Sequence, residues 1–126
     1  MDEGLPAQRV VVGGLDRTDA AAAGAPLEIA RRGAFVALDH VGSGNGAHIT
    51  DSERAAVVRE LVEAGHGDRI LLSSTAIGVA KGQPDCDVPF SYVLSTFVPL
   101  LTTKGLGDAD VQRILVDNPR GLLSVR

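Results

Sequence analysis

Three short apolar runs, each followed by a loop that contains glycine, are the feature that most constrains the fold of this chain. None of the runs alternates polar with apolar residues, which is typical of strands buried on both faces of a parallel sheet. Their spacing of roughly 25 to 35 residues is typical of strand-helix-strand crossovers. We therefore predict an α/β fold of three parallel βα units, with strands near residues 9–13, 34–38 and 69–73.

Helical patterns fill the intervals between and after these runs. An alanine-rich segment over 19–32, interrupted by Gly24 and Pro26, predicts the first helix, with Pro26 as an alternative start and a glycine at its end. Thr50 and Glu53 have the spacing of a capping box, in which each side chain accepts a hydrogen bond from the other residue's amide. The C-terminal helices are predicted over residues 89–117, and Asn118-Pro119 is predicted to end them.

Length, charge and cysteine content narrow the classes of protein that remain. The chain has 126 residues, which fits one domain over 1–126, and its net charge is −4. It has no basic run and only 3% aromatic residues, which argues against nucleic-acid binding. The single cysteine, Cys86, excludes an internal disulfide. No apolar stretch is long enough to span a bilayer and the first residues are polar, so a cytoplasmic protein without a membrane partner is expected.

The loops that follow the three strands are where chemistry is expected. Right-handed crossovers place all three loops at one edge of the sheet, which is the edge where α/β proteins carry their sites. Asp39-His40 in the second loop is the best catalytic candidate, because a carboxylate beside an imidazole can hold its tautomer and move a proton near neutral pH. The alternative is an aspartate that binds loop amides and a solvated histidine.

Other residues of these loops have simpler interpretations. Asp16 and Arg17 are expected to form a local ion pair that orders the first loop. His48 precedes the capping box and is assigned to the second loop. Gly13-Gly14 is interpreted as a tight turn, because it lacks the further glycines of a nucleotide-binding fingerprint.

Four segments together resemble the phosphotriesterase family, whose members are metal-dependent hydrolases of the amidohydrolase type. In chain order they are Arg9-Val-Val-Val-Gly-Gly-Leu-Asp-Arg17, Gly33-Ala-Phe-Val-Ala-Leu-Asp-His-Val41, Gly67-Asp-Arg-Ile-Leu-Leu-Ser73 and Ile114-Leu-Val-Asp-Asn-Pro-Arg120. The resemblance implies that the chain corresponds to the last three units of a (β/α)8 barrel. It would then be a single, incomplete-barrel domain.

The same resemblance implies what each loop residue would do. The family binds divalent metal, zinc among others, and two of the ligand positions fall on Gly14 and Thr75, neither of which supplies a comparable ligand. No metal is therefore expected to bind this chain alone. Asp39-His40 matches the family's proton-relaying pair, and Asp16, His48 and Thr75 are candidates for contact with substrate.

The expected function is hydrolysis of an ester bond in a small molecule: a phosphotriester, a lactone or a carboxyl ester. The chain is expected to be inactive alone, as a C-terminal portion or a degenerate member of the family. The alternatives are a non-catalytic assembly domain, a truncated gene product, or a small nucleotide-binding domain. Because the outer strands of a partial barrel have open edges, self-association or a homodimer is expected.

Overall fold

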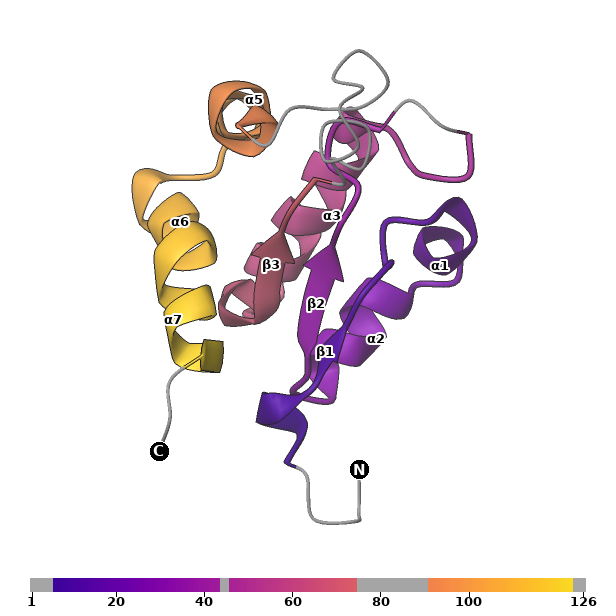
Figure 1. Ribbon diagram of the computed structural model, residues 1–126, viewed down its shortest axis with the longest axis vertical. Coiled ribbons are helices and arrows are strands. Elements are labelled where there is room, and N and C mark those ends of the chain that lie inside the picture. The colour runs from indigo at the N-terminus through magenta and orange to yellow at the C-terminus, as the bar shows by residue number, and fades with distance from the viewer. Residues whose placement is uncertain (1–5, 44–45, 75–90, 124–126) are drawn as a thin grey trace, which may run out of the picture.

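A parallel sheet of three strands organises the part of the chain that the computed structural model describes, residues 6–43, 46–74 and 91–123 (Figure 1). The strands are β1 (Val11–Val12), β2 (Phe35–Leu38) and β3 (Ile70–Leu72), in the order β1-β2-β3. Both pairings are parallel. Each strand lies inside the run that predicted it and is shorter than that run, so the predicted parallel α/β arrangement is confirmed.

Helices occupy the intervals between the strands. In chain order the helical elements are η1 (Ala7–Arg9), α1 (Thr18–Ala22), α2 (Ala25–Arg31), α3 (Asp51–Glu63), η2 (Gly67–Arg69), η4 (Val93–Phe97), α5 (Val98–Thr103), α6 (Asp108–Gln112), η5 (Arg113–Asp117) and α7 (Asn118–Leu123). The predicted capping box is present: Thr50 Oγ1 accepts the Glu53 N–H at 3.2 Å, and Glu53 Oε1 accepts the Thr50 N–H at 3.0 Å. None of the helices within the described residues is long and apolar enough to span a bilayer.

The last helical stretch continues past Pro119, so the prediction that Asn118-Pro119 ends it is wrong. The π-helical turn η5 comes directly before, and the Asn118 N–H donates to the carbonyl of Arg113. This wider turn gives the proline ring room against the preceding carbonyl, which an ordinary α-helical turn would not. The same arrangement recurs at Pro99, which follows the π-helical turn η4. Residues 89 and 90 of the predicted helix lie outside the described residues.

The hydrophobic core lies between the sheet and its helices. In the view of Figure 1, α2 and α3 lie behind the sheet, while α6 and α7 lie beside β3. Val36 and Leu38 of β2 are fully buried and belong to one cluster with α3 and the C-terminal helices. Because the strands are parallel, all three begin at one edge of the sheet and end at the other. We call the edge where the strands end the carboxyl edge, and the edge where they begin the amino edge.

Candidate functional site

Asp16 and His40 form a pair at the carboxyl edge that joins the first post-strand loop to the second. Asp16 Oδ1 lies 2.9 Å from His40 Nδ1, and Asp16 Oδ2 accepts the His40 backbone N–H at 2.8 Å. The Asp16 side chain is fully buried, whereas that of His40 is 25% exposed. Because a carboxylate only accepts hydrogen bonds, the facing Nδ1 carries the proton of the neutral ring and Nε2 is left as the basic atom.

Arg54 of α3 holds the buried carboxylate from the other side. Its Nε donates to Asp16 Oδ2 at 2.8 Å, and the arginine side chain is itself fully buried. Burial acts to raise the pKa of Asp16, but the hydrogen bonds from His40 and Arg54 outweigh it and lower the pKa below its ordinary value. Asp16 therefore remains a carboxylate at neutral pH.

His48 stacks on His40 and is part of the same cluster. The ring centroids are 3.9 Å apart and the ring planes differ by 14°. His48 Nδ1 lies 2.9 Å from Ser43 Oγ, and an isolated antiparallel bridge joins His48 to Arg17 of the first loop. Burial and the neighbouring His40 lower the pKa of His48, so its ring is neutral at pH 7. The second loop thus places two imidazoles face to face.

Asp39, the neighbour of His40 in sequence, points elsewhere. Its Oδ2 accepts the Gly14 N–H at 2.8 Å and its Oδ1 accepts a hydrogen bond from Ser73 Oγ at 3.4 Å. Successive residues of an extended segment face opposite sides, so Asp39 and His40 do not contact the same groups. A Cβ on Gly13 would come within 2.8 Å of Asp39 Oδ2, so the glycine makes room for this carboxylate. Asp39 therefore ties the three post-strand loops together.

The structure changes the interpretation of the first loop. Arg17 pairs with Asp19, at 3.3 Å, and not with Asp16, so the expected Asp16–Arg17 ion pair is wrong. The Asp16 carboxylate instead turns into the core, where His40 and Arg54 supply its hydrogen bonds. Thr75, the remaining candidate for contact with substrate, lies outside the described residues.

The sequence interpretation missed Arg54, although a signal for it exists. Arg54 precedes Val58 by four residues and Leu61 by seven, and both are fully buried on the apolar face of α3. A charged residue in register with an apolar helical stripe must have a buried partner or leave the core. This position therefore indicated a buried ion pair, but not which carboxylate completes it.

Comparison with known proteins decides the family. The model of the phosphotriesterase family matches residues 1–123. The chain belongs to the phosphotriesterase family. It is 26% identical over 132 residues to the N-acetyltaurine hydrolase of Dictyostelium discoideum, a match that covers 98% of this chain and 35% of that protein. The chain thus spans about a third of the length of this relative.

Solved phosphotriesterase-family structures share the fold. The phosphotriesterase homology protein of Escherichia coli, complexed with phosphate in its active site, superposes with a TM-score of 0.76 at 30% identity over 92% of this chain and 39% of that one. A mutant of the organophosphorus hydrolase from Deinococcus radiodurans gives a TM-score of 0.76 at 28% identity, covering 96% of this chain and 39% of the other. The three strands and their helices are therefore the family's fold over this part of its length.

The described part of the chain supplies no assembled set of ligands for a divalent metal. Gly14, at one ligand position implied by the family resemblance, has no side chain and adopts φ 68°, a left-handed conformation that other residues rarely take. Its amide is engaged by Asp39. Within the described ranges, no group of three or more His, Cys, Asp and Glu side chains is arranged to hold a metal ion.

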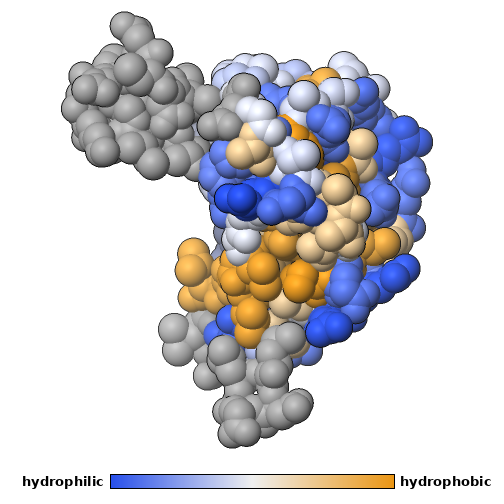
Figure 2. All heavy atoms as spheres, turned by 90° about the vertical axis from the view of Figure 1, so that its right-hand side faces the viewer, coloured by the Kyte–Doolittle hydropathy of each residue, from blue (hydrophilic) through white to orange (hydrophobic). Residues whose placement is uncertain are grey.

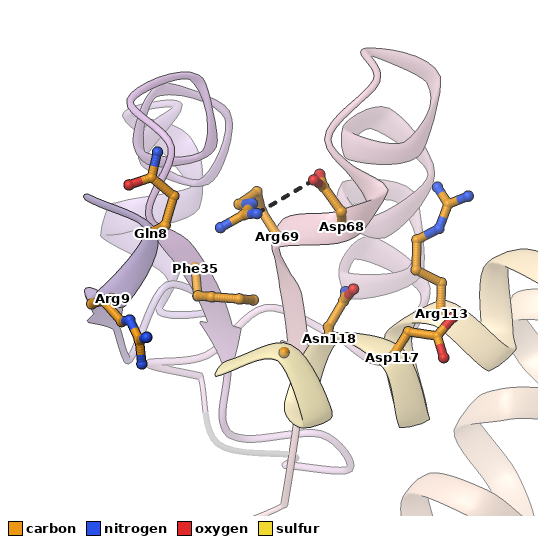
Figure 3. A pocket seen from close by; sticks show the side chains of 9 residues that line it. Gln8, Arg9, Phe35, Asp68, Arg69, Arg113, Asp117 and Asn118 are labelled. Carbon is orange, nitrogen blue, oxygen red and sulfur yellow. Dashed lines mark hydrogen bonds and ion pairs between the residues drawn. The ribbon is translucent and has the colours of Figure 1, made fainter. Parts of the chain in front are cut away.

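A cavity of about 560 Å³ lies at the amino edge, away from Asp16 and His40 (Figure 3). The guanidinium of Arg69 lies 4.6 Å from the ring centroid of Phe35 and pairs with Asp68 at 3.4 Å. Asn118 Nδ2 donates to the carbonyls of Gly67 and Ile70, both at 2.9 Å. The labelled arginines of Figure 3 point in different directions and do not converge on one point.

Proposed function

We propose that this chain forms the proton-transfer side of a phosphotriesterase-type hydrolase that acts on an ester bond in a small molecule: a phosphotriester, a lactone or a carboxyl ester. The observation that carries the proposal is the Asp16–His40 pair, with a buried carboxylate 2.9 Å from a partly exposed imidazole. The hydrolase names of its relatives support the reaction class.

His40 is the residue that would move the proton. Asp16 orients its ring through Nδ1, so that Nε2 can take a proton from water or return one to a leaving group. His48 covers one face of the ring at 3.9 Å and limits its rotation. Asp39 would contribute by holding the three loops together and not by contacting His40.

We propose further that the chain corresponds to the last three units of a (β/α)8 barrel and is inactive alone. Support comes from the relatives, of whose length it spans 35 to 39%, and from Gly14, which offers no ligand atom to a divalent metal such as zinc. The purified chain, supplied with zinc, cobalt or manganese, should hydrolyse aryl esters, lactones and phosphotriesters no faster than buffer does. Turnover clearly above buffer that is lost in His40→Ala would contradict the inactivity.

A fusion separates the catalytic role of His40 from the inactivity of the isolated chain. The chain is fused to the C-terminus of the N-terminal part of the Escherichia coli relative. Turnover is then compared among variants of a fusion that is active. His40→Ala should lower the rate by about 10²- to 10⁴-fold, the usual contribution of a general acid or base. His66→Ala is the matched control, because His66 lies at the start of η2 near the amino edge. An active fusion whose turnover is no lower with His40→Ala than with His66→Ala would refute the catalytic role of His40.

Self-association of the isolated chain is a related proposal. β1 is an outer strand of the sheet, and Val11 on it is 42% exposed. Apolar side chains gather on this side of the molecule at the level of β1 and α2 (Figure 2). Exposed strand edges with apolar side chains pair readily with another chain. Sedimentation should detect dimers or larger species that Val11→Lys shifts toward monomer; a monodisperse wild-type monomer would contradict this.

A further inference from the structure

Asp51, the first residue of α3, joins its own helix to the second loop and to Tyr92, which lies 41 residues later in the sequence. Its Oδ1 accepts the Gly42 N–H at 2.9 Å and pairs with Nη1 of Arg54. Its Oδ2 accepts the hydroxyl of Tyr92 at 2.6 Å. This hydrogen bond, together with burial, raises the pKa of Tyr92, so the phenol remains protonated and keeps donating at neutral pH.

Arg54 connects this carboxylate to the one that holds His40. One guanidinium donates to Asp16, to Asp51 and to the carbonyl of Ile49, the last at 2.9 Å. Its planar shape fixes the directions of these donors relative to one another, so the two carboxylates are held in one geometry. The side chain is fully buried, and water does not compete for its hydrogen bonds. The result is a continuous chain of polar contacts from Tyr92 to His40.

We propose that Arg54 is a positioning residue for His40. It fixes Asp16 so that the carboxylate accepts from Nδ1 of the imidazole and Nε2 stays available, and Tyr92 steadies Arg54 through Asp51. The catalytic meaning of this arrangement rests on the proposed function, but the arrangement can be measured without any turnover. Loss of the fork of donors would let Asp16 move, and the imidazole would then exchange between its two tautomers.

The test is the tautomeric state of His40 in the full chain, measured from the ¹⁵N resonances of its ring by long-range proton-nitrogen NMR at a pH high enough to keep the ring neutral in every variant. The wild type should give a protonated Nδ1 and an unprotonated Nε2. Arg54→Lys keeps the positive charge but loses the planar fork, so the two resonances of His40 should move toward one another. Tyr92→Phe should produce a smaller shift in the same direction.

Two internal controls accompany these variants. The resonances of His66 should not move in any of them, because His66 lies at the start of η2 near the other edge. Arg59→Lys alters an arginine of the same helix whose ion pair with Glu63 is exposed, and it should leave His40 unchanged. Each variant is first checked for cooperative unfolding, and if Arg54→Lys does not fold, Tyr92→Phe decides the question.

Unchanged His40 resonances in folded Arg54→Lys and Tyr92→Phe would overturn the positioning role. That result differs from failure of the proposed function, in which His40→Ala leaves the turnover of an active fusion intact. If Arg54→Lys changes the tautomer of His40 but His40→Ala does not change turnover, the positioning role of Arg54 is supported and the proposed reaction is refuted.

Discussion

Both edges of the sheet carry charged side chains, but they place them in different environments. At the carboxyl edge, Asp16 and Arg54 are fully buried and contact each other at 2.8 Å. At the amino edge, the side chains of Arg69 and Asp68 are 21% and 57% exposed and their contact is 3.4 Å. The cavity lined by Phe35, Arg69 and Asn118 lies at the amino edge, while the connected polar chain from Tyr92 to His40 lies at the carboxyl edge. Burial and coupling of charges thus distinguish the carboxyl edge, where the site is proposed, from the amino edge.

The energetic reason lies in the cost of burying a charge. A buried ion needs a paired partner and further hydrogen bonds, because the loss of hydration is several kcal/mol, whereas an exposed pair contributes about 0–1 kcal/mol. Asp16 meets this condition through His40 and Arg54. Substitutions at the two edges should therefore differ in size, and the following measurements test that difference.

The largest effect is expected for Arg54→Met. It leaves the carboxylates of Asp16 and Asp51 without their shared cation, and should lower the free energy of unfolding by about 3–5 kcal/mol. Urea unfolding measures this. Arg59→Met, on the same helix with an exposed partner, should change stability by about 0.5 kcal/mol or less. Similar losses in both variants would remove the distinction between buried and exposed charges.

Asn118→Ala probes the amino edge and should lower the free energy of unfolding by less than Arg54→Met does. It removes the donor of two buried hydrogen bonds, to the carbonyls of Gly67 and Ile70, and should destabilise by about 1–3 kcal/mol. Gln112→Ala, at an exposed position of α6, is the control. The NMR signature of His40 should survive Asn118→Ala, because the two edges are not connected through this side chain. Loss of that signature would mean that the edges are coupled.

Gly13→Ala should have a moderate effect at the carboxyl edge. The added methyl group would approach Asp39 Oδ2 to 2.8 Å and displace the carboxylate from the Gly14 amide, at a cost of about 1–2 kcal/mol. At Gly46 a Cβ meets nothing within 4 Å, so Gly46→Ala should be close to neutral in the same thermal and urea melts. Equal stabilities of the two variants would show that the Asp39 contacts contribute little.

The smallest expected effect is on how the free energy of unfolding depends on pH in acid, compared between Asp16→Asn and Arg59→Met. The pKa of Asp16 is lower in the folded chain than its ordinary value of 3.8, so its contribution is complete above that value and is lost as pH falls through the folded pKa. Asp16→Asn should therefore flatten the fall in unfolding free energy at acid pH. Arg59→Met should retain the wild-type profile. An unflattened profile in Asp16→Asn would mean that this carboxylate is not stabilised by folding.

Local patterns in the sequence were sufficient to predict the strands and the capping box. The three apolar runs need only burial on both faces, and Thr50 with Glu53 needs only one turn of helix. The end of the C-terminal helix was predicted wrongly, because the π-helical turn that accommodates Pro119 is a rare conformation that an Asn-Pro pair does not predict.

Local sequence patterns could not predict which carboxylate contacts His40 at the candidate site. Asp39 adjoins His40 in sequence, yet the carboxylate in contact with the ring is that of Asp16, 24 residues earlier. Strand register decides which loop residues meet, and a shift of one residue exchanges the two faces. His40 could be singled out from its residue type, whereas its partner and the buried Arg54 required the three-dimensional arrangement.

A double-mutant cycle on Asp16 and His40 tests the central claim most directly. Asp16→Asn, His40→Gln and the double variant are unfolded in urea, and the coupling energy is compared with that of the same cycle on Asp68 and Arg69. The coupling energy of Asp16 and His40 should be about 1–3 kcal/mol, and that of Asp68 and Arg69 about 0.5 kcal/mol or less. Equal coupling energies, or a larger value at the amino edge, would contradict the assignment of the site.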